Sequence, residues 1–307
     1  ITVRHLLTHV SGLRPDLDLE AEFDGYDEAI RRAAEEVPVS APGERFIYSD
    51  INFFLLGEIV VRVSGQSLDR FTDARIFEPL GMRDTMFAPP ETLRPRIAPT
   101  EPCARLAWPC QTPGAPMLRG VVHDPTARRM GGVAGHAGLF GTAADLATFC
   151  QMLLRGGEAG GVRILSPLAV AKMTSPATPS DMRAVRGLGW DIDTSYSANR
   201  GELLPLGSFG HTGFTGTSLW IDPQTRVFVV FLSNRVHPDG KGDVTPLRGR
   251  VATAAAAAMV EPLPALAARE ARWTGADFGA SGGPIPGPIE PVLTGLDGLE
   301  AEGFARL

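Results

Sequence analysis

The hydrophobic pattern of the 307-residue chain changes its period once, and this change limits the folds open to it. Apolar residues first recur at helical spacing, and we expect helices at residues 2–9, 26–36, 51–63, 67–78, 142–154 and 166–173. Strands are predicted at 187–192, 214–221 and 226–233, before an Ala-rich helix at about 245–260. Because helices and strands do not alternate strictly, we expect an α+β fold with an antiparallel sheet flanked by helices.

Shifts in composition suggest where the domains end. Residues 279–291 are rich in Gly and Pro and have few apolar anchors, as is typical of a linker. We therefore predict one domain over 1–262, a linker over 263–291, and at 292–307 either the start of a further domain or a tail. Within the first domain, the Pro-rich stretch 87–125 has little periodicity and is predicted to be irregular, as functional loops and lids often are.

Charge and cysteine content exclude several function classes. The net charge of −6 argues against a nucleic-acid partner, and no apolar run approaches the roughly 18 residues of a membrane span. The three cysteines lack metal-ligand spacing; we expect free thiols, with a bridge between the first two as the alternative. His5 and His9 are four residues apart, but Leu6 stands where a metalloprotease needs Glu, so we expect no metal and no cofactor.

Two short triads carry the chemistry of the sequence. Tyr48-Ser49-Asp50 precedes an apolar helix, and His211-Thr212-Gly213 lies in a Gly-rich run at the predicted start of a strand. Either triad alone is common by chance. Their order resembles the second and third motifs of the penicillin-recognising serine enzymes, whose motifs include Ser-x-x-Lys, Ser-Asp-Asn and Lys-Thr-Gly. The second motif here resembles the branch of that superfamily that carries Tyr.

Further blocks extend this resemblance over about residues 1–260, to the class C β-lactamase-related serine hydrolases. The blocks are those at residues 2–13, 55–57, 79–82, 135–140, 144–146, 187–190 and 233–235. The loop at 135–138 and the His-Asp-Pro block at His123 look most like D-alanyl-D-alanine carboxypeptidase or esterase members. The resemblance implies the β-lactamase and penicillin-binding-protein fold, with a mostly helical subdomain beside the sheet and with the family's N-terminal part missing from this chain.

The resemblance also implies roles for the first triad. Tyr48 would share the proton of a Ser nucleophile, which a phenol does only beside cations that favour the phenolate. Asp50 stands where the family often has Asn, and its carboxylate would hold a Lys ammonium. The alternative is that Asp50 is the N-cap of the helix at 51–63.

The second triad would bind the substrate. His211 replaces the usual Lys and, being partly charged at neutral pH, would hold a substrate carboxylate less firmly, unless it is a structural strand-end histidine. Thr212 would donate a hydrogen bond to substrate, and Gly213 would let substrate approach the backbone. The N–H of Phe214, with that of the nucleophilic Ser, would form the oxyanion hole. His136 would line the site or serve only to shape its loop.

The nucleophile itself is not found in this sequence. Neither of the two lysines, Lys172 and Lys241, has a Ser three residues before it. We expect the Ser and the Lys of Ser-x-x-Lys to lie upstream, so that this fragment is inactive by itself. The alternative is a non-catalytic protein that keeps the cleft for ligand binding or regulation and has lost the Ser.

The expected substrates are D-Ala-D-Ala-type peptides or other peptidoglycan fragments, small esters and, secondarily, β-lactams. The resemblance favours a periplasmic or secreted location. Residues 291–304 resemble, over a short stretch, the opening of an exo-β-N-acetylmuramidase domain, which would be a fused C-terminal partner domain.

Overall fold

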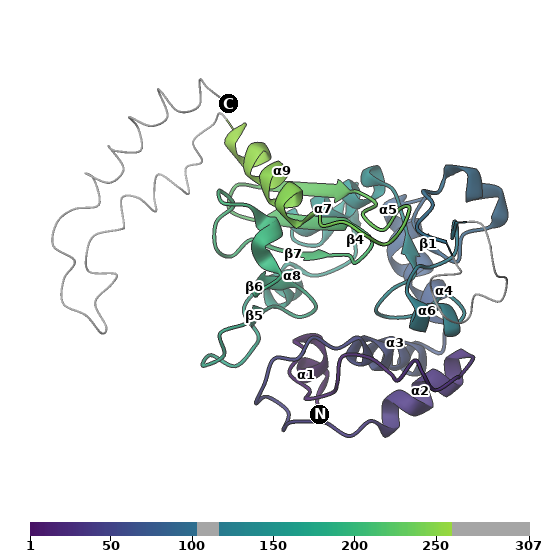
Figure 1. Cartoon of the computed structure of the whole chain (residues 1–307). Helices are drawn as coiled ribbons and strands as arrows, with labels where there is room; N and C mark the ends of the chain where they lie inside the picture. Colours follow the sequence, from purple (N-terminus) through teal and green to yellow (C-terminus); the bar gives the residue numbers. More distant parts are fainter. Residues whose placement is uncertain (103–116, 260–307) are drawn as a thin grey trace. The chain divides into compact units, whose positions relative to one another are not determined.

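A computed structural model describes residues 1–102 and 117–259 of the chain (Figure 1). The chain divides into two units, Ile1–Ala258 and Met259–Leu307, and all elements below belong to the first. The predicted linker, the residues at 292–307 and two of the cysteines, Cys103 and Cys110, lie outside the described residues.

A five-stranded antiparallel sheet forms the centre of the unit and confirms the expected α+β class. Its strands lie in the order β5-β6-β7-β8-β9. Their bounds are Val185–Arg186, Asp191–Asp193, Phe209–Thr212, Thr217–Asp222 and Val227–Leu232. Helix α9, Thr245–Ala257, crosses the sheet, and α7, Ala143–Leu154, also contacts it (Figure 1).

Side chains alternate across β8 and divide the core between the two faces of the sheet. Ile221 is fully buried in a cluster with Trp190, Phe209 and the α7 residue Met152. Its neighbour Trp220 points the other way and packs with Leu204 and Ala256 of α9. The sheet is therefore covered by α7 on one face and by α9 on the other.

Helix α3, Asp50–Ser64, organises a second core. Ile51 and Phe54 are fully buried there, against residues of α1, Val3–Leu7, and α2, Tyr26–Glu35. The helix ends at Gly65, which adopts φ 70°, a left-handed conformation that suits glycine at a helix C-terminus.

Short elements connect these two cores. The helices are α4 (Leu68–Thr72), the π-helical turn η1 (Asp73–Phe77), α5 (Glu78–Leu80), α6 (Pro125–Arg129), α8 (Pro167–Met173), and the 3-10 helices η2 (Glu91–Arg96) and η4 (Ser197–Arg200). Two strand pairs are β1 (Met86–Phe87) with β2 (Leu139–Phe140), and β3 (Glu158–Ala159) with β4 (Val162–Arg163).

Three predicted elements differ from the structure. Most of the strand expected at 187–192 is a turn between β5 and β6, in which the Gly187 N–H donates to the Trp190 carbonyl, and only its last two residues belong to a strand, β6. The strand expected at 214–221 begins only at Thr217, and the residues before it form a turn after the separate strand β7. The helix expected to stop before Pro79 continues, since proline is tolerated in the first turn of α5.

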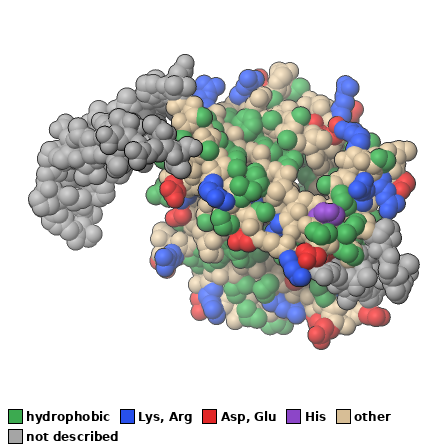
Figure 2. Space-filling model, turned by 45° about the horizontal axis from the view of Figure 1, so that its top comes forward, with side chains coloured by type: hydrophobic (Ala, Val, Ile, Leu, Met, Phe, Trp, Pro, Cys, Tyr) green, Lys and Arg blue, Asp and Glu red, His purple; other side chains and the backbone are tan. Residues whose placement is uncertain are grey.

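In the described part of the chain, no helix has both the length and the apolar character needed to cross a bilayer. On the face shown in Figure 2, basic side chains are interspersed with acidic ones.

Candidate active site

The fold brings the two triads together around the ring of Tyr48. This side chain lies on the loop just before α3, and His211 lies near the end of β7. Their ring centroids are 6.0 Å apart. The phenol ring also contacts Tyr196 at 5.4 Å and stacks on His9 at 4.3 Å. The structure therefore brings Tyr48 and His211 close to each other.

Backbone contacts to the segment after α1 hold the Tyr48 loop. The Ser49 N–H donates to Nδ1 of His9 at 3.0 Å, and the Asp50 N–H donates to the Pro15 carbonyl at 2.7 Å. The Ser49 hydroxyl is buried and donates to the Arg14 carbonyl at 2.6 Å. Since that hydroxyl is buried and engaged with the backbone, Ser49 fixes the loop and is not placed to act as a nucleophile.

His9 is a site residue that sequence reasoning missed. The sequence predicts a helix that continues through His9. In the structure His9 lies just after the end of α1 with φ 57°, so its side chain does not share a helix face with His5. Burial, first, and then the positive charge of Arg186 lower the pKa of His9 to about 2. A neutral ring whose Nδ1 accepts from Ser49 carries its proton on Nε2. His9 thus offers Tyr48 a flat, uncharged surface.

Asp50 faces a group of acidic residues. Burial, Asp124 and Asp16 raise its pKa to about 6, whereas His136 acts in the opposite direction. The alternative role as N-cap was wrong, because Ser49 occupies that position and Asp50 is the first residue of α3. A carboxylate in the first turn still interacts favourably with the helix dipole. Asp50 is close enough to Tyr48 to raise the pKa of the phenol.

His136 lies next to these acidic residues. Its Nε2 lies 2.8 Å from Oδ1 of Asp124, and its ring meets Phe54 of α3 edge-on at 4.4 Å. The loop that carries it sits directly on α3, because a Cβ on Gly135 would lie 2.0 Å from the Phe53 carbonyl oxygen. His136 is thus held beside Asp50 through Asp124.

His211 is uncharged in this structure at neutral pH. Burial and, to a smaller degree, Arg186 lower its pKa to about 4. Its Nδ1 lies 2.8 Å from the Thr212 carbonyl, so Nδ1 donates and Nε2 is left as the acceptor. The sequence predicts this triad at the start of a strand, whereas in the structure it lies at the end of β7.

The turn between β7 and β8 is held from two sides. Nη2 of Arg248 in α9 donates to the carbonyls of Gly213, at 2.8 Å, and Thr217, at 2.7 Å. Nε of Arg235 donates to the Phe214 carbonyl at 2.6 Å, and its guanidinium lies 4.2 Å from the centre of the Phe214 ring. His123 stacks on the same ring at 5.6 Å. These contacts fix the backbone on either side of the Phe214 amide.

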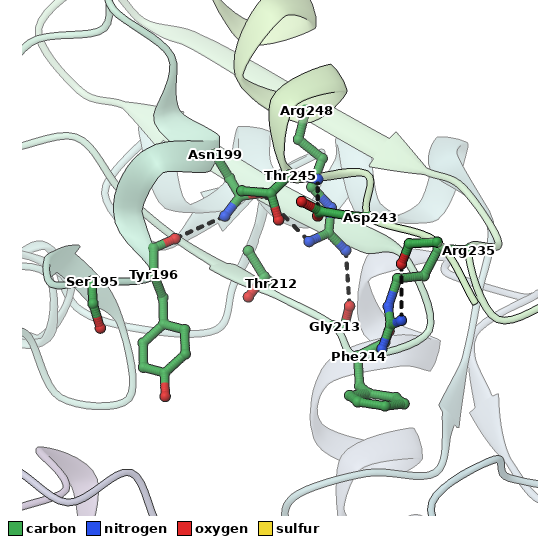
Figure 3. A pocket seen from close by; sticks show the side chains of 11 residues that line it. Ser195, Tyr196, Asn199, Thr212, Gly213, Phe214, Arg235, Asp243, Thr245 and Arg248 are labelled. Carbon is green, nitrogen blue, oxygen red and sulfur yellow. Dashed lines mark hydrogen bonds between the residues drawn. The ribbon is translucent and has the colours of Figure 1, made fainter. Parts of the chain in front are cut away.

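A pocket of about 300 Å³ opens beside this turn (Figure 3). Thr212 and Phe214 line it from the turn, Tyr196 from the segment at η4, and Arg235 and Asp243 from the chain leading to α9. The pocket thus lies next to the side chain of Thr212. No cluster of three or more His, Cys, Asp or Glu side chains in residues 1–102 and 117–259 is arranged to hold a metal ion.

Arg186 is the second residue that sequence reasoning missed. Its guanidinium carbon lies 5.9 Å from the centre of the Tyr48 ring, although the side chain comes from β5. Neither Arg186 nor Tyr196 belongs to either triad, and no local motif marks them. His9, by contrast, lies within the block at residues 2–13 that carries the family resemblance.

Comparison with known proteins identifies the family of the chain. Residues 1–254 match the family model described as Beta-lactamase. A Salmonella schwarzengrund protein named "Putative D-alanyl-D-alanine carboxypeptidase" is 38% identical over 206 residues, which cover 64% of this chain and 46% of that protein. The chain therefore spans about half the length of the curated relatives it matches.

Solved structures share the fold. A beta-lactamase from Mycobacterium bovis is 26% identical with a TM-score of 0.56, and the match covers 83% of this chain and 73% of that one. A family VIII carboxylesterase is 23% identical with a TM-score of 0.60, covering 84% of this chain and 71% of that one; this second likeness shows the fold alone.

Proposed function

The chain belongs to the beta-lactamase family, and from that premise we propose that the complete protein is a serine hydrolase working through a Ser acyl-enzyme. The observation that carries the proposal is the 6.0 Å approach of Tyr48 to His211, residues of two motifs that are distant in sequence. In this proposal the Tyr48 phenol, the Thr212 hydroxyl and the Phe214 amide supply the proton relay and the hydrogen-bond donors that acyl transfer needs besides a nucleophile.

The proposed nucleophile is a Ser outside these 307 residues, followed three residues later by Lys. No Ser-x-x-Lys occurs in the sequence, and the buried Ser49 is engaged with the Arg14 carbonyl. In this proposal the Ser Oγ attacks the substrate carbonyl and its proton passes to the Tyr48 oxygen. Tyr48 then returns the proton to the leaving group, and a water molecule hydrolyses the acyl-enzyme by the same exchange.

The second motif and the turn after it would bind the reacting group. The N–H of Phe214, together with that of the nucleophilic Ser, would stabilise the negative charge that develops on the carbonyl oxygen. Arg235 and His123 support this assignment, because they hold Phe214 from its carbonyl and its ring. Asp50 would hold the ammonium of the Ser-x-x-Lys lysine, and His136 would line the same side of the site.

We propose a D-Ala-D-Ala-type peptide or a small ester as substrate, with β-lactams as secondary substrates. The name of the Salmonella relative supports a peptide with a free carboxylate. The low pKa of His211 supports the ester, because a neutral imidazole gives a carboxylate no charge to bind. For a carboxylate, Thr212 and the neighbouring pocket with Arg235 would supply the donors.

A second candidate is a non-catalytic member of the family that binds ligands without turning them over. The absence of Ser-x-x-Lys from this sequence favours it. The two candidates differ in whether the complete protein contains that motif.

Covalent labelling distinguishes them. We expect a fluorophosphonate probe and a fluorescent penicillin to label the complete protein at a single Ser outside these 307 residues, and a Ser→Ala change there to abolish labelling. These 307 residues by themselves should stay unlabelled. Labelling of a Ser within them would remove the proposed position of the nucleophile, and an unlabelled complete protein would favour the non-catalytic candidate.

A further inference from the structure

The buried guanidinium of Arg186 has no role in the steps above. Its side chain is 1% exposed, and its three nitrogens make no hydrogen bond to the residues described. The nearest carboxylate oxygen, Oδ1 of Asp191, lies 4.0 Å from Nη1 and is itself without a hydrogen bond in the described part of the chain. A buried cation that lacks acceptors is unfavourable, so its position calls for a reason beyond packing.

Arg186 faces the Tyr48 ring, with Cζ 5.9 Å from its centre. The other charged or titratable groups around that ring are His9, Asp50, Asp191, Tyr196 and His211. The two histidines are neutral at pH 7, because burial and Arg186 lower the pKa of each. Burial, first, and then Asp50, Tyr196 and Asp191 raise the pKa of Tyr48 to about 12, whereas the charge of Arg186 acts in the opposite direction.

We propose that Arg186 is a positioning residue whose permanent positive charge stabilises the phenolate form of Tyr48. His211 stands where the family usually has a Lys, and as a neutral ring it provides no such charge. Arginine suits this place because it stays protonated even when buried, whereas a buried lysine readily loses its proton. Its planar group also interacts favourably with an electron-rich ring.

The use of this charge in acyl transfer rests on the proposed function, but the coupling of Arg186 to Tyr48 does not. A cation 5.9 Å from the ring favours the phenolate whether or not the site turns over substrate. The coupling is therefore measurable as an ionisation of Tyr48 alone.

The test places 3,5-difluorotyrosine at position 48 of the complete protein and follows its ¹⁹F shift against pH. The fluorines lower the pKa into the range where proteins stay folded. Arg186→Gln should weaken the acidity at position 48 by roughly 10- to 100-fold, and Arg186→Lys by less. The control Arg155→Gln, which also removes one positive charge but from an exposed site, should leave the titration unchanged.

For Asp191→Asn we expect the acidity at position 48 to shift in the opposite direction, and this variant can be measured even if Arg186→Gln does not fold. It removes a negative charge and leaves Arg186 in place, so position 48 should become the stronger acid. An unchanged titration in Arg186→Gln, or a shift in Asp191→Asn in the same direction as in Arg186→Gln, would overturn the proposal and leave Arg186 a packing residue. If a variant loses turnover but the titration at position 48 does not shift, the proposal is likewise overturned. If the titration shifts but the complete protein shows no turnover, only the proposed function is contradicted.

Discussion

His9 and Tyr48 stack with their ring centroids 4.3 Å apart and their planes inclined by 25°. The same histidine accepts the Ser49 N–H through Nδ1, so one side chain fixes both the ring of Tyr48 and the backbone next to it. The position of the phenol therefore depends on a residue that sits just after the first helix of the chain.

The first prediction concerns this contact. His9→Phe keeps a flat ring against Tyr48 but leaves the buried Ser49 N–H without an acceptor, which should lower the free energy of unfolding by about 1–3 kcal/mol. Denaturant unfolding measures the loss. His5→Phe is the control, since His5 is partly exposed on α1, and it should cost much less. Equal effects of the two changes would mean that the His9 hydrogen bond has no special weight.

The second prediction concerns acid. Burial lowers the pKa of His9 to about 2 and of His211 to about 4, below the 6.5 of an unfolded chain. Stability from these neutral rings is complete above pH 6.5 and is lost as the pH falls toward the folded values. We expect the free energy of unfolding to fall from pH 6.5 to 4, by at most about 1.4 kcal/mol per pH unit for each histidine. His211→Gln should flatten the decline.

Asp50 affects the free energy of unfolding in the opposite direction over the same pH range. Its pKa is raised from 3.8 to about 6, so its contribution to stability is present below pH 3.8 and is lost as the pH rises through 6. Removing this group by Asp50→Asn should therefore steepen the acid decline. An Asp50→Asn variant with the slope of the unaltered protein would contradict the burial of a protonated carboxyl at this position.

The third prediction separates recognition from structure at His211. His211→Lys adds a cation at the end of β7, so it should lower KM for substrates with a carboxylate and leave neutral esters nearly unchanged. Steady-state kinetics of the complete protein on one substrate of each kind measures this. Equal losses on both substrates, with an unchanged melting temperature, would place His211 outside the recognition site.

The fourth prediction concerns the clamp on Phe214. Arg235→Gln removes both the bond to the Phe214 carbonyl and the cation on its ring, so the amide beside it should lose its fixed position. For a neutral ester, which has no carboxylate for Arg235 to bind, we expect kcat to fall by up to about 100-fold with little change in KM. Arg155→Gln, on the exposed end of α7, should have no effect. A change confined to KM would indicate that Arg235 binds substrate rather than holding the turn.

Much of the fold could be predicted from periodicity, because helices such as α3 and α7 bury one continuous apolar face. The strands β5 and β6 could not, because each has only two or three residues and the turn between them carries no distinct signal. Ser49 rather than Asp50 occupies the N-cap position of α3, but its hydroxyl donates to the Arg14 carbonyl and makes no capping hydrogen bond, which the sequence does not indicate.

Only part of the candidate site could be predicted from the sequence. Tyr48 and His211 stand in recognisable triads, but Arg186 of β5 and Tyr196, just before η4, reach the same ring without any local pattern. Residues of this kind are found only when the strands are placed beside one another, since their role follows from burial and charge at the site and not from spacing along the chain.

The most direct test of the proposed mechanism is the rate of ester hydrolysis by the complete protein carrying Tyr48→Phe. The change removes one hydroxyl and keeps the ring on His9, so the fold should survive. We predict a fall in kcat of roughly 10²–10⁴-fold, the usual effect of losing a positioned acid–base group. Tyr26→Phe, which removes a hydroxyl bonded to Glu58, should leave the rate unaltered. An undiminished rate in Tyr48→Phe would contradict the central role of Tyr48.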